Sequence, residues 1–225
     1  MTSKILIRNL YKIYNEEKEN QFFALKDINI EINNGEIVII KGVSGSGKST
    51  LLALIGALSK PSRGDILVEN QNIAKLPDIF SSQYRNEEVG FIFQSFNLID
   101  GLSVYDNVKA PLVLKNIKQS ELSEKVEEAL KLANISHKSE QMVSNLSGGE
   151  KQRCAIARAL VHAPSVILAD EPTANLDRDN SLLFLEILKK FKELNKTVIV
   201  ATHDVIFDNL TVADKYINIQ DGVVL

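Results

Sequence analysis

The stretch Gly42-Val43-Ser44-Gly45-Ser46-Gly47-Lys48-Ser49-Thr50 decides the fold of this chain. It fits the pattern G-x-x-x-x-G-K-[ST], in which glycines let the backbone turn tightly and point successive N–H groups into a concave anion site. A helix that begins near Lys48 adds the positive end of its dipole to the same site. The stretch therefore predicts a phosphate-binding loop, with the Lys48 ammonium on the β- and γ-phosphates of a nucleotide and the Ser49 hydroxyl on Mg²⁺.

The residues on either side of this loop give it the context that the pattern requires. Glu36-Ile37-Val38-Ile39-Ile40 is a short, β-branched apolar run, which predicts a buried strand. A helix is expected to follow from about Lys48 to Leu58. A plain glycine-rich turn before a helix is the alternative, but the order of strand, loop and helix favours nucleotide binding.

Bulk properties exclude several classes of protein. The chain has 225 residues and a formal net charge of −3, so it lacks the strongly basic balance typical of nucleic-acid binding. The single cysteine, Cys154, excludes an internal disulfide and is expected to be buried in a helix. The N-terminus has no signal-peptide core, and the longest apolar stretch, Leu51 to Leu58, is far short of the ~20 residues of a membrane span. If the chain acts in a membrane process, other subunits are expected to supply the span.

Apolar periodicity predicts the remaining elements. Residues 1–35 read as antiparallel strands, since Ile28, Ile30 and Ile32 alternate with polar residues. Asp221-Gly222 between apolar runs predicts a hairpin in the tail at 215–225. Further strands are expected at 65–69, 166–170 and 197–202, and amphipathic helices at 121–133 and 183–194.

Two more stretches carry candidate chemistry. Val166-Ile167-Leu168-Ala169 leads into Asp170-Glu171, and a carboxylate at the end of a parallel strand beside a phosphate-binding loop can hold Mg²⁺, while Glu171 can polarise an attacking water. Leu146-Ser147-Gly148-Gly149-Glu150 opens a helix with a hydroxyl and bare N–H groups, which suits a second anion site. A solvated loop and a capped helix are the respective alternatives.

The order of these motifs resembles the nucleotide-binding subunit of an ATP-binding-cassette (ABC) transporter, over essentially the whole chain. Leu146 to Glu150 matches the family signature, with Glu150 where many members have glutamine. Gln94, in Phe91-Ile92-Phe93-Gln94, is similar to the family's Q-loop, and Ala174-Asn175-Leu176-Asp177 to its D-loop. His203 matches the switch histidine, and Tyr14 matches the aromatic residue that stacks on adenine, with Tyr11 as a competitor.

The resemblance implies the fold. It predicts an α/β protein with a P-loop NTPase core, a mostly parallel sheet, an N-terminal antiparallel β subdomain and an inserted α-helical subdomain. It predicts a single domain over 1–225, in which about 1–94 and 161–225 form the core and β subdomain and about 95–160 form the helical subdomain with the signature.

The resemblance also implies the ligands and the roles of individual residues. ATP and Mg²⁺ are the expected ligands, and two copies pack head to tail, so that the signature of one chain contacts the nucleotide on the other. The implied catalytic residues are Glu171 as general base, His203, Gln94 and Lys48. The implied ATP-binding residues are Tyr14, Gly42, Ser44, Gly45, Ser46, Gly47, Lys48, Ser49, Thr50 and Gln94. The implied metal ligands are Ser49, Gln94 and Asp170; Ser147, Gly148, Gly149 and Glu150 act in trans, and Asp177 belongs to the D-loop.

The expected function is that of an ATPase subunit that drives a membrane permease. The stretch Gly90 to Leu98, followed by Ser103 to Val108, is similar to the lipoprotein-releasing and macrolide-exporter (LolD/MacB-like) group. An ATPase of a polar amino-acid importer is the main alternative. A soluble ABC ATPase acting on ribosomes or DNA, and a nucleotide-binding module without turnover, are less favoured.

The expected partners are a second copy or a related ATPase subunit and integral membrane permease subunits, with no nucleic acid. The expected location is the cytoplasmic face of the inner (plasma) membrane, held there through the permease. The expected permease contact lies between Gln94 and Val108 and includes the apolar residues Phe96, Leu98, Ile99 and Leu102; a buried helical core is the alternative.

Overall fold

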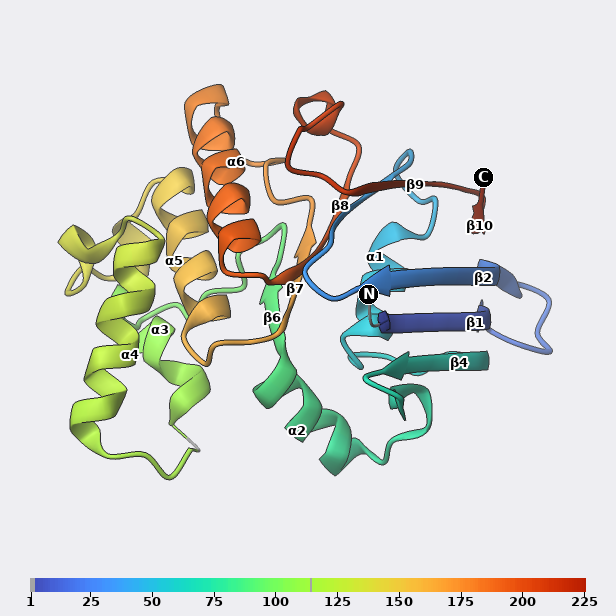
Figure 1. Ribbon diagram of the computed structural model, residues 1–225, viewed down its shortest axis with the longest axis horizontal. Coiled ribbons are helices and arrows are strands. Elements are labelled where there is room, and N and C mark those ends of the chain that lie inside the picture. Colours follow the sequence, from blue (N-terminus) through green and yellow to red (C-terminus); the bar gives the residue numbers. More distant parts are fainter. Residues whose placement is uncertain (1–2, 114) are drawn as a thin grey trace.

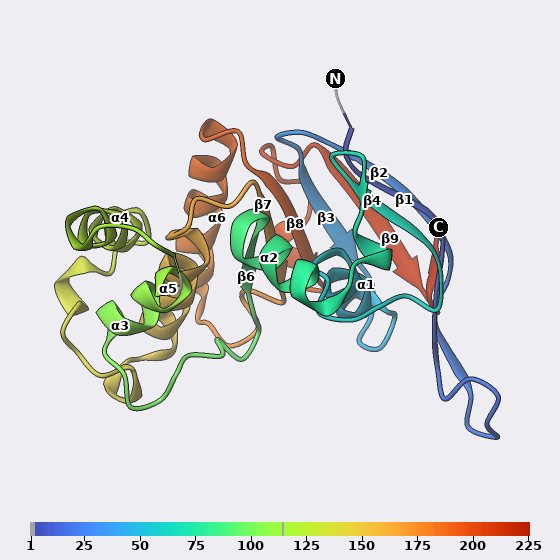
Figure 2. The ribbon, with the colours of Figure 1, turned by 90° about the horizontal axis from the view of Figure 1, so that it is seen from below.

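The computed structural model describes residues 3–113 and 115–225. Two sheets pack around one helix, and the other helices lie beside and below them (Figures 1 and 2). The strands are β1 (Ser3–Tyr14), β2 (Phe22–Asn33), β3 (Ile37–Lys41), β4 (Arg63–Val68), β5 (Gln71–Asn72), β6 (Val89–Ile92), β7 (Val166–Asp170), β8 (Thr197–Thr202), β9 (Lys215–Gln220) and β10 (Val223–Val224). The α-helices are α1 (Lys48–Ile55), α2 (Asp78–Glu88), α3 (Val104–Lys109), α4 (Gln119–Leu132), α5 (Gly148–Leu160) and α6 (Arg178–Glu193).

The larger sheet has the strand order β10-β9-β3-β8-β7-β6, and β9, β3, β8, β7 and β6 run parallel. Both faces of this sheet are covered, which explains the continuous apolar runs in its sequence. Alternate residues of β3 belong to different cores: Ile37 and Ile39 face the cluster formed with the helices, whereas Val38 and Ile40 face the second sheet. The buried strands predicted at 36–40, 166–170 and 197–202 are confirmed.

The smaller, antiparallel sheet has the order β2-β1-β4-β5. Helix α1 lies between the two sheets (Figure 2) and is apolar because Leu51, Leu52, Leu54 and Ile55 are all buried there. The helix ends at Ile55 rather than at the expected Leu58, because Gly56 caps it and the next residue adopts a positive φ. Beyond the helix, Ala57 still packs against the core between the two sheets, whereas Leu58 is 48% exposed.

The helices α3, α4, α5 and α6 gather on the side of the parallel sheet that faces away from the smaller sheet (Figure 1). Helix α4 matches the predicted 121–133 closely, but α6 begins at Arg178 and not at Leu183. The Asp177 side chain caps α6 by accepting a hydrogen bond from Asn180 N at 2.8 Å, which starts the helix before its first long apolar residue. Cys154 is fully buried on α5, as predicted, and burial raises the pKa of its thiol to about 12.

The predicted C-terminal hairpin is present. Strands β9 and β10 pair antiparallel around Asp221 and Gly222, both of which have positive φ angles, as a tight hairpin turn requires. None of the helices formed by residues 3–113 and 115–225 is long and apolar enough to cross a membrane.

Candidate active site at the carboxyl ends of the parallel strands

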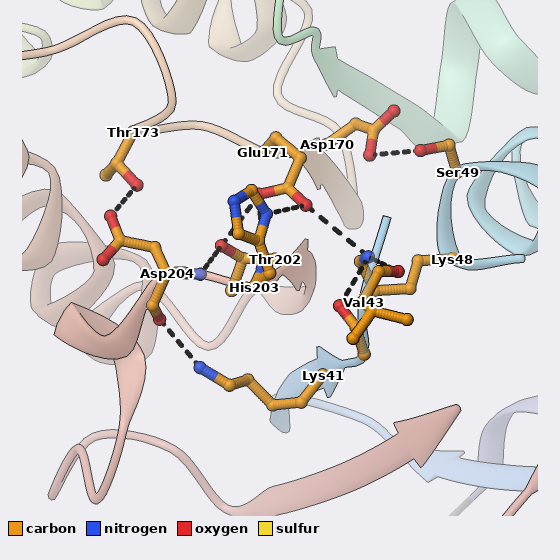
Figure 3. Close-up of polar contacts among 11 residues, drawn as sticks. Lys41, Val43, Lys48, Ser49, Asp170, Glu171, Thr173, Thr202, His203 and Asp204 are labelled. Carbon is orange, nitrogen blue, oxygen red and sulfur yellow. Dashed lines mark hydrogen bonds and ion pairs between the residues drawn. The ribbon is translucent and has the colours of Figure 1, made fainter. Parts of the chain in front are cut away.

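Three adjacent parallel strands end at the same edge of the sheet, and the loop after each one carries predicted site residues. The phosphate-binding loop follows β3, Asp170 and Glu171 follow the apolar part of β7, and His203 follows β8. Figure 3 shows these side chains meeting at one place. Because β3, β8 and β7 are neighbours in that order, residues far apart in sequence reach one another.

The phosphate-binding loop is held in shape by contacts among its own residues. Gly45 and Gly47 have φ angles of 79° and 107°, which other residues rarely adopt. The buried Lys48 side chain folds back over the loop, and its Nζ donates hydrogen bonds to Gly42 O at 2.8 Å and Val43 O at 3.0 Å. The Ser46 hydroxyl is buried and has no hydrogen-bond partner among the described residues, so the loop holds a polar group without a partner. This is the arrangement that an anionic ligand would complete.

A hydrogen bond between two side-chain oxygens joins this loop to strand β7. Ser49 Oγ donates a hydrogen bond to Asp170 Oδ1 at 2.8 Å. Burial raises the pKa of the Asp170 carboxyl, and the hydrogen bond from Ser49 opposes that shift. A hydroxyl and a carboxylate side by side are the oxygen ligands that Mg²⁺ prefers, so the donor set fits the predicted metal. Within the described residues, no group of three or more His, Cys, Asp and Glu side chains is arranged to hold a metal ion.

Glu171 lies at the centre of the polar contacts in Figure 3. Its Oε1 lies 2.8 Å from His203 Nδ1 and 3.6 Å from Lys48 Nζ. Its Oε2 accepts hydrogen bonds from Thr202 Oγ1 at 3.0 Å and from His203 N at 3.3 Å. The carboxylate is therefore buried, held on both oxygens, and adjacent to the Lys48 ammonium, while the His203 side chain is 61% exposed.

Gln94 is exposed, and its position is fixed by a hydrogen bond to its backbone carbonyl. Its carbonyl accepts a hydrogen bond from Asn175 Nδ2 at 2.8 Å, which ties the predicted Q-loop to the predicted D-loop. Among the described residues no hydrogen bond joins the Gln94 side chain to Ser49 or Asp170, so the structure brings two of the three predicted metal ligands together and not the third.

The predicted signature caps helix α5. Ser147 Oγ accepts a hydrogen bond from Glu150 N, and Glu150 Oε2 accepts one from Ser147 N at 2.8 Å, so the two residues form a capping box. The bond from the Ser147 backbone, helped by Lys138 at 3.1 Å, lowers the pKa of Glu150 to about 2. No hydrogen bond or ion pair links these four residues, 147–150, to residues 42–50 of the same chain, all of which are described.

The aromatic residue predicted to meet adenine lies near the hairpin between β1 and β2. Tyr14 is 40% exposed and stacks on Phe22, with ring centroids 5.6 Å apart and planes at 11°. Lys12 Nζ lies 5.1 Å from the Tyr14 ring centroid. Tyr11 is half-buried and pairs with Arg63 of β4. The role of Tyr14 stays a prediction.

A cleft of about 350 Å³ lies beside the predicted permease contact. Phe93 and Asn97 line it from the Q-loop side, and Arg158 and His162 line it from the end of α5. Of the four apolar residues in the predicted contact, Ile99 is 47% exposed, whereas Phe96, Leu98 and Leu102 are half-buried. Leu98 packs against the helical core, so the segment predicted to contact the permease also contributes to packing of the core.

Sequence reasoning missed three residues of the site. Thr202 contacts Glu171, Asp204 contacts Thr202 through its backbone N–H, and Thr173 donates a hydrogen bond from Oγ1 to Asp204 Oδ2 at 2.7 Å. Thr202 stands in a β-branched apolar strand, where a threonine reads as an ordinary strand residue. Its position directly before His203 is the only signal in the sequence.

Comparison with known proteins gives consistent matches. A family model described as ABC transporter matches residues 25–174. The lipoprotein-releasing system ATP-binding protein LolD of Pseudoalteromonas translucida is 40% identical over 212 residues, which cover 94% of this chain and 89% of that protein. The macrolide export ATP-binding/permease protein MacB of Chlorobium luteolum is 39% identical over 208 residues, which cover 92% of this chain and 31% of that protein.

A solved structure is similar over nearly the whole chain. The ATP-binding cassette MJ0796 of Methanocaldococcus jannaschii matches with a TM-score of 0.90 and 39% identity, over 98% of this chain and 96% of that one. That structure is dimeric, in a post-hydrolysis state bound to ADP and Pi. The likeness confirms the fold expected from the order of the motifs.

Proposed function

This chain belongs to the ABC transporter family as one of its ATP-hydrolysing subunits, and from that premise we propose that head-to-tail dimerisation on ATP drives a permease of the LolD/MacB-like type. The observation that carries the proposal is the meeting of Lys48, Glu171 and His203 at one edge of the parallel sheet. An ammonium, a carboxylate and an imidazole at one place suit phosphoryl transfer, which depends on positioning the reactants and on neutralising charge.

The phosphate-binding loop and Lys48 bind the phosphates of ATP in this proposal, and Tyr14 stacks on the adenine. Ser49, Asp170 and Gln94 hold Mg²⁺, which when bound neutralises charge on the phosphate oxygens. In the structure Lys48 Nζ is occupied by Gly42 O and Val43 O. Phosphate oxygens replace these carbonyls as acceptors, so binding draws the ammonium away from Glu171.

Glu171 then acts as general base. Its Oε2 stays held by Thr202 and by the His203 backbone, while Oε1 becomes free to accept a proton from the attacking water. His203 Nδ1 contacts the same oxygen in the structure, and its exposed ring is available to meet the γ-phosphate. Holding one oxygen and releasing the other keeps the base oriented.

The signature acts on the nucleotide of a second copy. Residues 147–150 make no polar contact with residues 42–50 of their own chain, and their N–H groups lie at the start of α5 with Ser147 as cap. The D-loop residue Asp177 caps the neighbouring helix α6. The dimeric state of the similar cassette MJ0796 supports this arrangement.

The permease contact is proposed for the segment from Gln94 to Val108 together with the cleft that Asn97 of this segment lines. Its lining combines Phe93 and Asn97 with Arg158 and His162, so it offers apolar surface and polar groups to a cytoplasmic helix of a permease. The proposed division at about 95 and 160 makes this cleft the boundary between core and helical subdomain. Through this contact the subunit lies on the cytoplasmic face of the inner membrane. A polar amino-acid importer remains the second candidate, because its Q-loop region is similar.

Light scattering after size-exclusion chromatography tests the proposal. Glu171→Gln should slow hydrolysis by ~10²–10⁴ and still bind ATP. With ATP and no Mg²⁺ it should shift from monomer to dimer, and adding Lys48→Ala should abolish the shift. Wild-type turnover in Glu171→Gln would remove the base role. Absence of a dimer, even with a co-expressed permease, would contradict the head-to-tail arrangement.

A further inference from the structure

Thr202, the last residue of β8, carries a fully buried hydroxyl whose contacts lead to Glu171. Its Oγ1 donates a hydrogen bond to Glu171 Oε2 at 3.0 Å and accepts one from Asp204 N at 3.0 Å (Figure 3). Both partners lie in loops at the carboxyl edge of the sheet. The hydroxyl therefore links the acidic residue after β7 to the loop after β8.

Asp204 extends this link into a closed network. Its Oδ2 accepts the hydrogen bond from Thr173 Oγ1 at 2.7 Å, and Thr173 is only two residues beyond Glu171. Its carbonyl accepts a hydrogen bond from Lys41 Nζ at 2.7 Å, at the end of β3. Glu171, Thr202, Asp204 and Thr173 thus tie the two loops together twice, and Lys41 anchors the network to a third strand.

Glu171 needs such support because its own backbone is unfavourable. Its φ is 44°, in the left-handed region that side-chain-bearing residues seldom adopt. Its N–H donates to Ala201 O at 2.8 Å, so the backbone is held by β8 while the carboxylate is held by the next residue of the same strand. Such conformations persist only where the surroundings enforce them.

The Thr202 hydroxyl has one structural partner, the backbone N–H of Asp204, and a second partner in the Glu171 carboxylate. The preceding residues of β8, Val198 to Ala201, are buried and apolar, and valine has nearly the shape of threonine. A buried hydroxyl requires polar partners, and the one that Thr202 donates to is the carboxylate of the proposed base. Without it, Glu171 Oε2 keeps only the 3.3 Å hydrogen bond from His203 N.

We propose that Thr202 is a positioning residue for hydrolysis: its hydroxyl fixes the Glu171 carboxylate in the orientation in which the other oxygen can take the proton of water. The inference rests on the proposed role of Glu171. It predicts that Thr202→Val lowers kcat by up to about 100-fold, the cost of misplacing a catalytic group by about 1 Å, with KM for ATP and the affinity for a fluorescent ATP analogue unchanged.

Thr197 supplies a matched control. It is the first residue of β8, is equally buried, and its hydroxyl accepts a hydrogen bond from Gly35 N at 3.0 Å, at the opposite end of the strand from Glu171. Thr197→Val removes the same group from the same strand, so it should lower thermal stability and leave kcat unchanged. Thr202→Ser keeps the hydroxyl and should restore most of the kcat that Thr202→Val loses.

A double-mutant cycle makes the test specific. In the Glu171→Gln background Thr202→Val should cause little further loss, because its effect passes through the carboxylate. An equal loss in both backgrounds, or a kcat for Thr202→Val that matches Thr197→Val, would overturn the proposal. Should Thr202→Val not fold, Thr202→Ala takes its place in the same cycle. Wild-type turnover in Glu171→Gln alone would contradict the base role instead, so the two failures are distinct.

Discussion

Ser49 Oγ donates a hydrogen bond to Asp170 Oδ1 at 2.8 Å, although the two residues are 121 positions apart in the chain. The contact places an oxygen from the first turn of α1 against an oxygen from the end of β7. Burial would otherwise leave the Asp170 charge poorly compensated, which is why its pKa is raised and why the hydroxyl turns toward it. A divalent cation bound here would take over that compensation.

Ser49→Ala should therefore raise the Mg²⁺ concentration needed for half-maximal hydrolysis by roughly tenfold or more, since one oxygen ligand is lost. The affinity for ATP without Mg²⁺ should change little, because the N–H groups of the loop and Lys48 remain. Hydrolysis measured over a Mg²⁺ titration, with nucleotide binding measured in chelator, separates the two quantities. Ser49→Thr retains the hydroxyl and serves as control. An unchanged Mg²⁺ requirement in the alanine variant would contradict the assignment.

Gly149 should be intolerant of a side chain. A Cβ at this position would overlap the side-chain amide of Asn180, which is held by Arg153 Nη1 at 2.8 Å and donates to Asp177 Oδ1 at 2.9 Å. Gly149→Ala must displace this amide, and overpacking of this kind costs about 1–3 kcal/mol. The free energy of unfolding in urea measures it. Gly148→Ala, whose Cβ would meet only Asn175 O at 3.2 Å, should cost less. Equal costs would show that Asn180 moves freely.

His162 should make stability depend on pH. Burial, together with the charge of Lys115, lowers the pKa of His162 from 6.5 to about 4. Between these values the unfolded chain binds a proton that the folded chain does not, so stability is complete above pH 6.5 and is lost as the pH falls toward 4. The loss amounts to about 2 kcal/mol at pH 5.

His162→Asn removes this titration, so the loss of unfolding free energy between about pH 7.5 and pH 5 should shrink by that amount. Urea unfolding at the two pH values measures it. The same substitution at the exposed His137, His137→Asn, serves as the matched control for the loss of an imidazole. An unaltered slope in His162→Asn would mean that other groups cause the acid sensitivity.

The sequence was most informative where local chemistry alone sets the structure. The strands at 36–40, 166–170 and 197–202 were predictable because a strand buried on both faces is continuously apolar. The start of α6 was predicted five residues late, because the apolar pattern does not include a cap such as Asp177. The family resemblance, and not the pattern, gave the grouping of Lys48, Glu171 and His203, since strand order depends on contacts distant in sequence.

Details of the site depended on contacts that no local pattern encodes. The stacking of Tyr14 on Phe22 follows from the register of β1 and β2, which is interrupted by irregularities at several points. The support of Glu171 by Thr202 depends on the left-handed backbone conformation at Glu171, which a glutamate in the sequence does not predict. Functional residues were therefore identified more readily than the residues that hold them in place.

The predicted permease contact contains both exposed residues and residues that pack against the core. Ile99 is 47% exposed, and Phe96 is half-buried with its carbonyl accepting a hydrogen bond from Arg158 Nη2 at 2.7 Å. Leu98 packs against the helical core, so a polar residue there would also cost stability. Ile99→Gln and Phe96→Gln should therefore weaken the stimulation of hydrolysis by a co-purified permease roughly tenfold, about 1.4 kcal/mol of contact energy. Hydrolysis by the isolated subunit should not change.

Leu225→Gln provides the control for that measurement, because Leu225 is 76% exposed at the C-terminus, on the opposite side of the molecule from α3 and α4 (Figure 1). It changes exposed apolar surface by a similar amount at a place remote from the cleft. Stimulation should stay at the wild-type level in this variant. If Ile99→Gln and Phe96→Gln also kept full stimulation, the permease would have to contact another surface, because a buried apolar contact cannot accept a polar side chain without loss.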